Sequence, residues 1–386
     1  MKYKQLSQTA DWRIDRISAE NVKHSNYIST ENMLPNRGGV EGASSLPEAK
    51  TLSKYVAGDI LLSNIRPYFK KIWFADTTGG CSNDVLVVQP NGVDAKFLYY
   101  VLSDNNFFNY STVTSKGTKM PRGSKSAIMK YLIPDVNKPT QTRIADILSA
   151  YDNAIENNNR RIAFLEKAAR ELYREWFVRF RFPGHEGVRV VDGLPEGWEV
   201  TRLGELVNIT SSKRSYDSER VAVGIPLYRS KEIIQIENGE EITEPLFISK
   251  EWFVGIRDKF GAPQENDILI TSRGTIGVPF LVDNRIFYFS DGNLTWLQSG
   301  RTPELAIYIY LWLNSPIGQG TVLASTIGTS QKALPIETLK KAKIVKPSDM
   351  ILKEFCGMAM SLVNKKGICG QNQKTLPVSA TCFCHG

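Results

Sequence analysis

One heptad pattern near the middle of the chain constrains its fold more than any other feature. Between Thr140 and Trp176, seam positions step alternately by four and by three residues: Ile144, Leu148, Tyr151, Ile155, Asn158, Ile162, Leu165, Ala169, Leu172 and Trp176. This spacing predicts one long, straight helix whose seam packs against a partner helix. Asn158 either fixes the register of the pair or marks a solvated break in it. At a rise of 1.5 Å per residue, the seam spans roughly 50 Å and predicts a rigid spacer.

Length and charge indicate two globular units and a polyanionic partner. A chain of 386 residues fits two domains plus connecting structure. Lys and Arg exceed Asp and Glu by 48 − 40 = 8, which favours nucleic acid, although many basic proteins merely have solvated surfaces. The N-terminus lacks an apolar leader and no apolar run reaches the ~18–20 residues that span a bilayer, so we expect a cytoplasmic protein without membrane contact.

The chain repeats itself after about 210 residues. Gly58-Asp-Ile-Leu-Leu-Ser-Asn-Ile-Arg66 returns as Asn266-Asp-Ile-Leu-Ile-Thr-Ser-Arg-Gly274, an offset of 267 − 59 = 208 for the shared Asp-Ile-Leu. Each copy continues with a strand-like run, a polar turn, a helical stretch and a late Gly-Thr pair at Gly117 or Gly328. The repeat predicts two similar α/β units with short strands.

A second helix follows the second unit and then loses its pattern. Seam positions continue at the following residues: Ile351, Phe355, Met358 and Leu362. From Gly367 onward the tail has no helical period and contains two glycines and Pro377, so we expect the helix to end at about residue 366. Three of the five cysteines fall in this tail, which suggests translation out of frame from about codon 367 or a natural divergent tail. Cys382, Cys384 and His385 lack the second ligand pair of a closed zinc site, so we predict no metal site.

These features together resemble the specificity subunit of type I restriction–modification enzymes. Pro139-Thr-Gln-Thr-Arg-Ile-Ala-Asp-Ile-Leu148 opens the first helix and Leu194-Pro-Glu-Gly-Trp198 opens the second unit, and the resemblance covers residues 1 to about 366. It implies an α+β fold in which two similar α/β target-recognition domains are separated by long helices that form an antiparallel coiled coil. The expected segments are residues 1–138, the first helix 139–182, residues 183–347, and a truncated or frameshifted second helix 348–386.

The same resemblance implies the function and the partners. Each domain reads one half of a bipartite site on double-stranded DNA, two methylation subunits dock on the helices, and restriction subunits join the full complex. S-adenosylmethionine, ATP and Mg²⁺ are implied only for those partners, so this chain would carry no cofactor.

Candidate DNA contacts are basic and polar residues in loops, because cationic loops neutralise phosphates and Arg also pairs with guanine. In the first unit they are Asn64, Arg66, Lys70, Lys71, Lys116, Lys119, Arg122 and Lys125. In the second they are Lys213, Arg214, Ser272, Arg273, Thr275, Gln331 and Lys332. Arg66 and Arg273 follow the same repeated strand, where they either contact DNA or brace a carboxylate such as Asp59 or Asp267.

Motifs for catalysis are absent from the sequence. There is neither the Asn/Asp-Pro-Pro-aromatic tetrapeptide of a DNA methyltransferase nor a phosphate-binding Gly-x-x-x-x-Gly-Lys-Ser/Thr loop. The three histidines are scattered along the chain. We therefore expect a non-catalytic recognition subunit; the alternative is a coiled-coil adaptor whose α/β units bind a ligand other than DNA.

Overall fold

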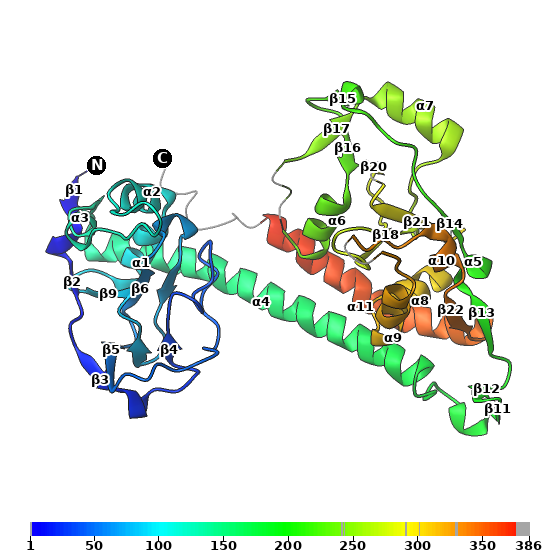
Figure 1. The fold of residues 1–386 in the computed structure, drawn as a ribbon, viewed down its shortest axis with the longest axis horizontal. Helices are drawn as coiled ribbons and strands as arrows, with labels where there is room; N and C mark the ends of the chain where they lie inside the picture. The colour runs from blue at the N-terminus through cyan, green and yellow to red at the C-terminus, as the bar shows by residue number, and fades with distance from the viewer. Residues whose placement is uncertain are drawn as a thin grey trace. The chain divides into compact units, whose positions relative to one another are not determined.

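The computed structural model divides the chain into two compact units (Figure 1). It describes residues 2–240, 242, 244–289, 292–300, 302–328 and 331–375. The residues up to Glu156 form unit 1, and Asn157–Lys374 form unit 2. The division falls inside one continuous helix of 40 residues, α4 (Lys138–Phe177), so each unit contains part of that helix.

The described part of unit 1 contains two four-stranded sheets, a two-stranded sheet and three short α-helices besides the first part of α4. The large sheets have the strand orders β2-β9-β6-β7 and β3-β5-β8-β4, and β1 pairs with β10. The strands are β1 (Tyr3–Gln5), β2 (Ala10–Trp12), β3 (Arg16–Ser18), β4 (Tyr27–Ile28), β5 (Thr51–Tyr55), β6 (Ile60–Ser63), β7 (Ile72–Phe74), β8 (Gly79–Cys81), β9 (Val85–Pro90) and β10 (Leu132–Pro134). The short helices are α1 (Ala95–Ser103), α2 (Asn105–Val113) and α3 (Lys125–Ile128).

Unit 2 repeats this plan and adds helices. Its large sheets have the orders β14-β21-β18-β19 and β15-β17-β16-β20, while β13 pairs with β22 and β11 with β12. The strands are β11 (Val190–Val191), β12 (Leu194–Pro195), β13 (Glu199–Arg202), β14 (Asn208–Thr210), β15 (Arg220–Val221), β16 (Ile225–Tyr228), β17 (Leu246–Ile248), β18 (Ile268–Thr271), β19 (Pro279–Leu281), β20 (Tyr288–Phe289), β21 (Leu294–Gln298) and β22 (Lys343–Lys346). The helices are α5 (Leu203–Leu206), α6 (Ser230–Glu237), α7 (Lys250–Phe260), α8 (Pro303–Leu313), α9 (Pro316–Ala324), α10 (Ile336–Lys340) and α11 (Asp349–Thr375).

The strand pairing confirms the repeat predicted from the sequence. The Asp-Ile-Leu segments form the central strands β6 and β18, and each pairs with the strand that follows it and with a later strand of its sheet. The second sheets differ, because unit 1 places β8 between β5 and β4 whereas unit 2 places β16 between β17 and β20. Helix α6 lies between β16 and β17 and helix α7 between β17 and β18, whereas the described part of unit 1 has no α-helix between β4 and β6.

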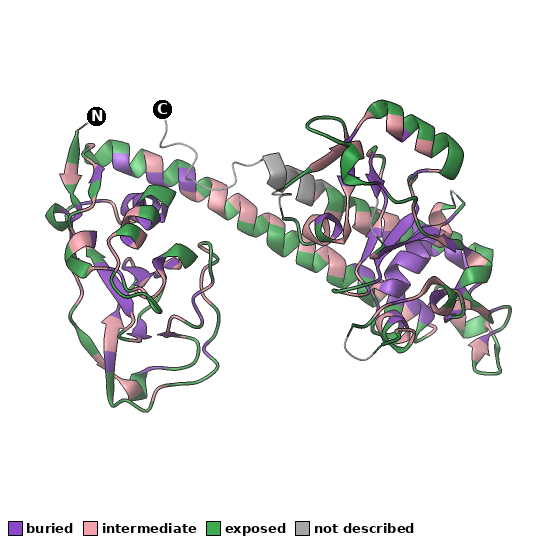
Figure 2. Ribbon diagram, turned by 45° about the horizontal axis from the view of Figure 1, so that its top comes forward, coloured by how far each residue is buried: buried purple, intermediate pink, exposed green. Residues whose placement is uncertain are grey.

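Each unit has its own hydrophobic core. In unit 1, Ala145 of α4 packs with Phe97 and Ile133, and the Asp94 backbone N–H donates to Gln141 Oε1 at 2.8 Å. In unit 2, the residues of α8 from Ala306 to Leu313 are all buried, and Figure 2 shows this helix in purple within the core. The core of unit 2 is thus built around an apolar helix.

The α4 seam predicted from the heptad pattern is the less exposed face of the helix. None of its ten positions is exposed, and Leu148, Ala169 and Trp176 are buried. Asn158 is half-buried. Tyr173 and Phe177 are also buried, so the face is wider than a two-position heptad seam. The helix ends at Phe177, because Phe180 adopts a left-handed φ of 56° before Pro183.

Helix α11 packs antiparallel to the second half of α4 within unit 2. Phe355 lies 5.6 Å from Trp176 and 4.6 Å from Phe177 between ring centroids, whereas Lys366, later in α11, lies 2.9 Å from Glu166, earlier in α4. The predicted antiparallel pair is therefore present.

Two details of the second helix differ from the prediction. Met358 is 49% exposed, so its place in the seam was wrong; the buried face contains Ile351, Phe355 and Ala359, with Leu362 partly buried. This face steps mostly by four because α11 packs on both α4 and the body of unit 2. The helix also continues past Gly367 to Thr375, so the expected end at residue 366 was wrong. A glycine inside a helix lowers the stability of the helix by only about 1 kcal/mol relative to alanine. A helix that has already formed can therefore continue through it.

The proposed shift of reading frame concerns the coding sequence and stays a prediction. Cys382, Cys384 and His385, the residues considered for a metal site, lie outside the described residues.

Candidate nucleic-acid interface

In unit 1, two loops that lie far apart in the sequence pair with each other. Arg122 forms isolated β-bridges with Ile65, just after β6, and with Lys116. The Gly123 backbone N–H donates to Asn64 O at 3.0 Å, and the Arg66 N–H donates to Pro121 O at 2.8 Å. The structure thus joins two groups of sequence-predicted residues, 64–71 and 116–125, into one surface, here called the unit 1 loop surface.

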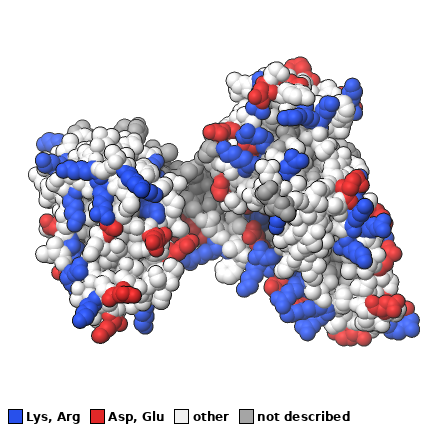
Figure 3. Space-filling model, in the orientation of Figure 1, with Lys and Arg blue, Asp and Glu red and all other residues white. Residues whose placement is uncertain are grey.

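The second of these loops is basic and exposed. The exposed side chains are Lys116, Lys119, Arg122 and Lys125. Arg122 Nη2 lies 3.1 Å from Asp84 Oδ1, and Lys125 begins the short helix α3. Figure 3 shows Lys and Arg side chains gathered on the face of unit 1 around α2 and α3. An excess of cations on one face can neutralise several phosphates at once.

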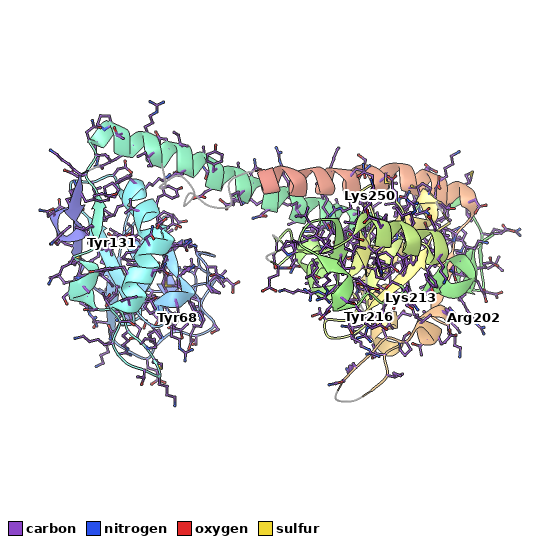
Figure 4. The ribbon with its side chains drawn as sticks, turned by 90° about the horizontal axis from the view of Figure 1, so that it is seen from above. Tyr68, Tyr131, Arg202, Lys213, Tyr216 and Lys250 are labelled. Atoms are coloured by element: carbon purple, nitrogen blue, oxygen red, sulfur yellow. The ribbon has the colours of Figure 1, made fainter. Side chains whose placement is uncertain are left out.

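The lysines in the loop after β6 form hydrogen bonds within the protein. Lys70 Nζ donates to Asn105 Oδ1 at 2.8 Å, and Lys71 Nζ donates to Thr30 O at 2.6 Å. Burial lowers the pKa of Lys71. Tyr68 is 47% exposed and lies on the side of unit 1 away from α4 (Figure 4). Of this loop, Tyr68 is therefore better placed for a ligand than Lys71.

Asn64 and Arg66 are half-buried, and one polar atom of each is fully enclosed. Asn64 Oδ1 and Arg66 Nε are buried and have no hydrogen-bond partner among the described residues. Arg66 does not brace Asp59, because Asp59 accepts instead from Arg13 Nε at 2.6 Å. A buried polar atom without a hydrogen-bond partner lowers the stability of the fold by roughly 1–3 kcal/mol. A rearrangement that gave these two atoms partners would therefore be stabilising.

Unit 2 builds the same loop frame from equivalent residues. Ala333 forms isolated β-bridges with Arg273 and with Ile327. The Leu334 N–H donates to Ser272 O at 2.9 Å, as Gly123 does to Asn64, and the Ser272 N–H donates to Asn293 O at 2.7 Å. Asn64 N–H donates to Asp84 O in the same way at 2.8 Å. Asn293 is therefore the counterpart of Asp84.

The loops of unit 2 line a groove together with α6. The groove, here called the unit 2 groove, is lined by Ser230, Lys231, Ile234, Gln235, Glu240, Arg273, Gly274, Thr275, Asn293, Gln331, Lys332 and Ala333. It unites four predicted residues: Arg273, Thr275, Gln331 and Lys332. The predicted Ser272 is buried at 5% exposure. Sequence reasoning missed Lys231 and Asn293; the offset of 293 − 84 = 209 would have found Asn293.

The predicted cluster of Lys213, Arg214 and Tyr216 is a separate surface. Lys213 Nζ lies 5.4 Å from the ring centroid of Phe260 on α7, and Arg214 lies 5.7 Å from that of Tyr216. Tyr216 is 59% exposed, and Figure 4 shows Lys213 and Tyr216 close together. None of the three lines the unit 2 groove.

The bridges agree with the repeat and show that Arg66 and Arg273 occupy different positions in the two units. Arg273 occupies the bridge position of Ile65, an offset of 273 − 65 = 208, so Arg66 corresponds to Gly274. Each unit has one arginine in this bridge. In unit 1 it is Arg122, from the later loop, and in unit 2 it is Arg273, from the segment after β18. Arg122 has a carboxylate partner in Asp84, whereas the equivalent position in unit 2 is the uncharged Asn293. Asp267 accepts from Trp296 Nε1 at 2.9 Å, so Arg273 is not needed to brace it.

Other kinds of site find no support in the described part of the chain. Its residues contain no group of three or more His, Cys, Asp or Glu placed to hold a metal ion. None of its helices is long and apolar enough to cross a membrane.

Comparisons with known proteins agree with the repeat. A family model described as the type I restriction modification DNA specificity domain matches residues 18–167 and again residues 195–351. The type I restriction enzyme MjaIX specificity subunit of Methanocaldococcus jannaschii is 27% identical over 290 residues, 72% of this chain and 65% of that protein. The MjaVIII specificity subunit of the same organism is 33% identical over 147 residues, 37% of this chain and 34% of that protein. These matches span less than two thirds of the length of either relative.

A solved structure shares the fold. The crystal structure of the type I restriction–modification S subunit from M. genitalium superposes with a TM-score of 0.65 at 16% identity, covering 97% of this chain and 92% of that one.

Proposed function

Because this chain belongs to the type I restriction modification DNA specificity family, we propose that it reads a bipartite DNA site for a type I restriction–modification complex. Units 1 and 2 each read one half of that site. The loop frame that both units share carries this proposal: the same backbone bridge presents different exposed side chains in each unit. A constant frame with variable side chains suits two readers of different sequences.

The side chains suit two forms of contact with DNA. The unit 1 loop surface offers Lys116, Lys119 and Lys125 beside Arg122, which suits phosphates on both sides of a groove. The unit 2 groove offers Arg273 and Gln331, and Arg pairs with guanine O6 and N7 while Gln pairs with adenine N6 and N7. Unit 1 therefore contributes more of the salt-dependent affinity, and unit 2 more of its contacts to base edges.

The remaining parts of the complex are proposed from the family. Two methylation subunits dock on the frame of α4 and α11, and restriction subunits complete the assembly. The chain itself performs no catalysis. The partner subunits bind and use S-adenosylmethionine, ATP and Mg²⁺.

Selection from a random duplex library, with the chain and its methylation subunits together, tests this function. We expect the bound DNA to contain two short conserved blocks separated by a fixed number of unspecified base pairs. Affinity should also fall steeply between 50 and 200 mM salt. A selected pool without any shared sequence, or no binding at low salt, would be incompatible with the proposal.

Replacing Asp84 with Asn should strengthen DNA binding. The change gives unit 1 the residue type that unit 2 already has at this position, and it removes the carboxylate that lies 3.1 Å from Arg122. We expect the slope of log affinity against log salt to steepen by about one phosphate contact, ~0.9. The control is Asp146→Asn, which removes an exposed carboxylate on α4. Equal slopes for Asp84→Asn and the unchanged chain would show that Arg122 does not contact phosphate.

A further inference from the structure

Three helices of unit 2 meet at one lysine. Lys366 Nζ on α11 lies 2.9 Å from Glu166 Oε1 on α4 and 3.1 Å from Glu237 Oε2 on α6. The side chains of Lys366 and Glu237 are only 21% and 18% exposed. This ammonium therefore joins the helix pair to α6 through two ion pairs that are largely withdrawn from water.

The charges in this cluster depend on one another. Burial raises the pKa of Glu237, and Lys366 opposes that rise. Burial works against the charge on Lys366, but Tyr310, Glu237 and Glu166 together raise its pKa. The other cation beside the cluster is Arg170, which lies 3.9 Å from Glu166 and lines the same cavity of about 190 Å³. The ion pair of Arg170 stays within α4, whereas Lys366 pairs with both Glu166 on α4 and Glu237 on α6.

Helix α6 is also the wall of the unit 2 groove. Ser230, Lys231, Ile234 and Gln235 line the groove, and Glu237 is the last residue of the same helix. Ile233 anchors the other side of α6 in the core at 0% exposure. Ile236 packs against the same core, and Tyr310 Oη on α8 donates to Glu237 Oε2 at 3.5 Å. The ion pair between Glu237 and Lys366 adds a link from the end of α6 to α11.

We propose that Lys366 is a positioning residue for DNA reading by unit 2: it fixes α6 against the α4 and α11 pair and so sets the shape of the unit 2 groove. This inference rests on the proposed function. It makes the fine geometry of one reading surface depend on a helix that never touches that surface.

Four variants of the full chain, each with its methylation subunits, separate positioning from stability. Lys366→Met removes the bridge, and Arg170→Met is the matched control, because it removes a cation from the same cavity without touching α6. Lys366→Arg keeps a cation. The double variant Lys366→Met with Glu237→Gln removes the bridge without leaving Glu237 as an unpaired buried charge.

Two measurements apply to every variant. The first is amide hydrogen exchange of residues 230–237, which reports the anchoring of α6 without any DNA. The second is selection from the random duplex library, with Arg273→Ala used to identify the half-site that unit 2 reads.

For Lys366→Met and for the double variant we expect faster exchange in α6 and about tenfold weaker discrimination in the half-site of unit 2 alone. Arg170→Met should change neither the exchange rate in α6 nor the discrimination. Lys366→Arg should keep most of the protection from exchange and most of the discrimination. Unchanged α6 exchange in Lys366→Met overturns the inference, and so does full discrimination by the double variant. If the unchanged chain selects no sequence at all, the proposed function fails as well; if it selects a site that Lys366→Met reads equally well, only the inference fails.

Discussion

Replacing Phe177 with Ala is expected to destabilise unit 2 by about 3–5 kcal/mol. Phe177 is 4% exposed, and its ring centroid lies 4.6 Å from that of Phe355 on α11 and 4.8 Å from that of Tyr308 on α8. It also lies 5.6 Å from Trp198, which precedes β13. The substitution thus opens a cavity where several elements of unit 2 meet. Since whole domains are stable by only about 5–15 kcal/mol, a large share of the stability of unit 2 would be lost.

The same helix supplies a matched control. Phe164 is 71% exposed on α4, so Phe164→Ala should change stability by no more than about 0.5 kcal/mol. Urea unfolding followed by amide exchange in α8 measures the effect in unit 2, and exchange in β6 and β9 reports unit 1, which should not change. Equal losses for both variants would mean that the aromatic cluster does not hold unit 2 together.

The second large effect concerns DNA binding by unit 1. Replacing Lys116, Lys119, Arg122 and Lys125 together with Gln should lower affinity for duplex DNA at least a hundredfold at low salt. These four side chains are exposed, so the fold should tolerate the change. If each contacts one phosphate, the slope of log affinity against log salt should fall by roughly three to four units.

Basic residues of α4 provide the control for charge. Lys138 and Arg143 are exposed on α4, which lies on the side of unit 1 away from Tyr68 (Figure 4). Replacing both with Gln lowers the net charge but should leave the slope nearly unchanged. Similar losses per charge in the two sets would show that affinity follows net charge rather than the loop surface.

The large elements of the fold were predictable because their patterns span many residues. A heptad seam of ten positions and a repeat with five aligned landmarks leave few alternative structures, and both the helix pair and the two similar units are present. The pattern was less informative for α11, because a helix that packs on two neighbours buries a wide face, and heptad counting wrongly placed Met358 inside it.

The surfaces were harder to predict because they depend on backbone pairing between distant segments. The repeat aligned Arg273 with Ile65, and the bridges agree with that alignment, but no sequence pattern showed that Arg122 and Ala333 would pair with these positions from distant loops. Helix α6 was missed because Ile233, Ile234 and Ile236 suit a strand as well as a helix.

The division inside α4 affects how the chain could be recombined. The core of unit 2 includes Ala169, Tyr173, Trp176 and Phe177, all of which precede the boundary at 183 that the sequence suggested. The units divide at Asn157, the first of three consecutive asparagines, residues that favour helices only weakly. A chimera that exchanged the second reader between relatives at residue 183 would leave its hydrophobic core incomplete. A crossover within the asparagine run would transfer the reader together with the half-helix that completes it.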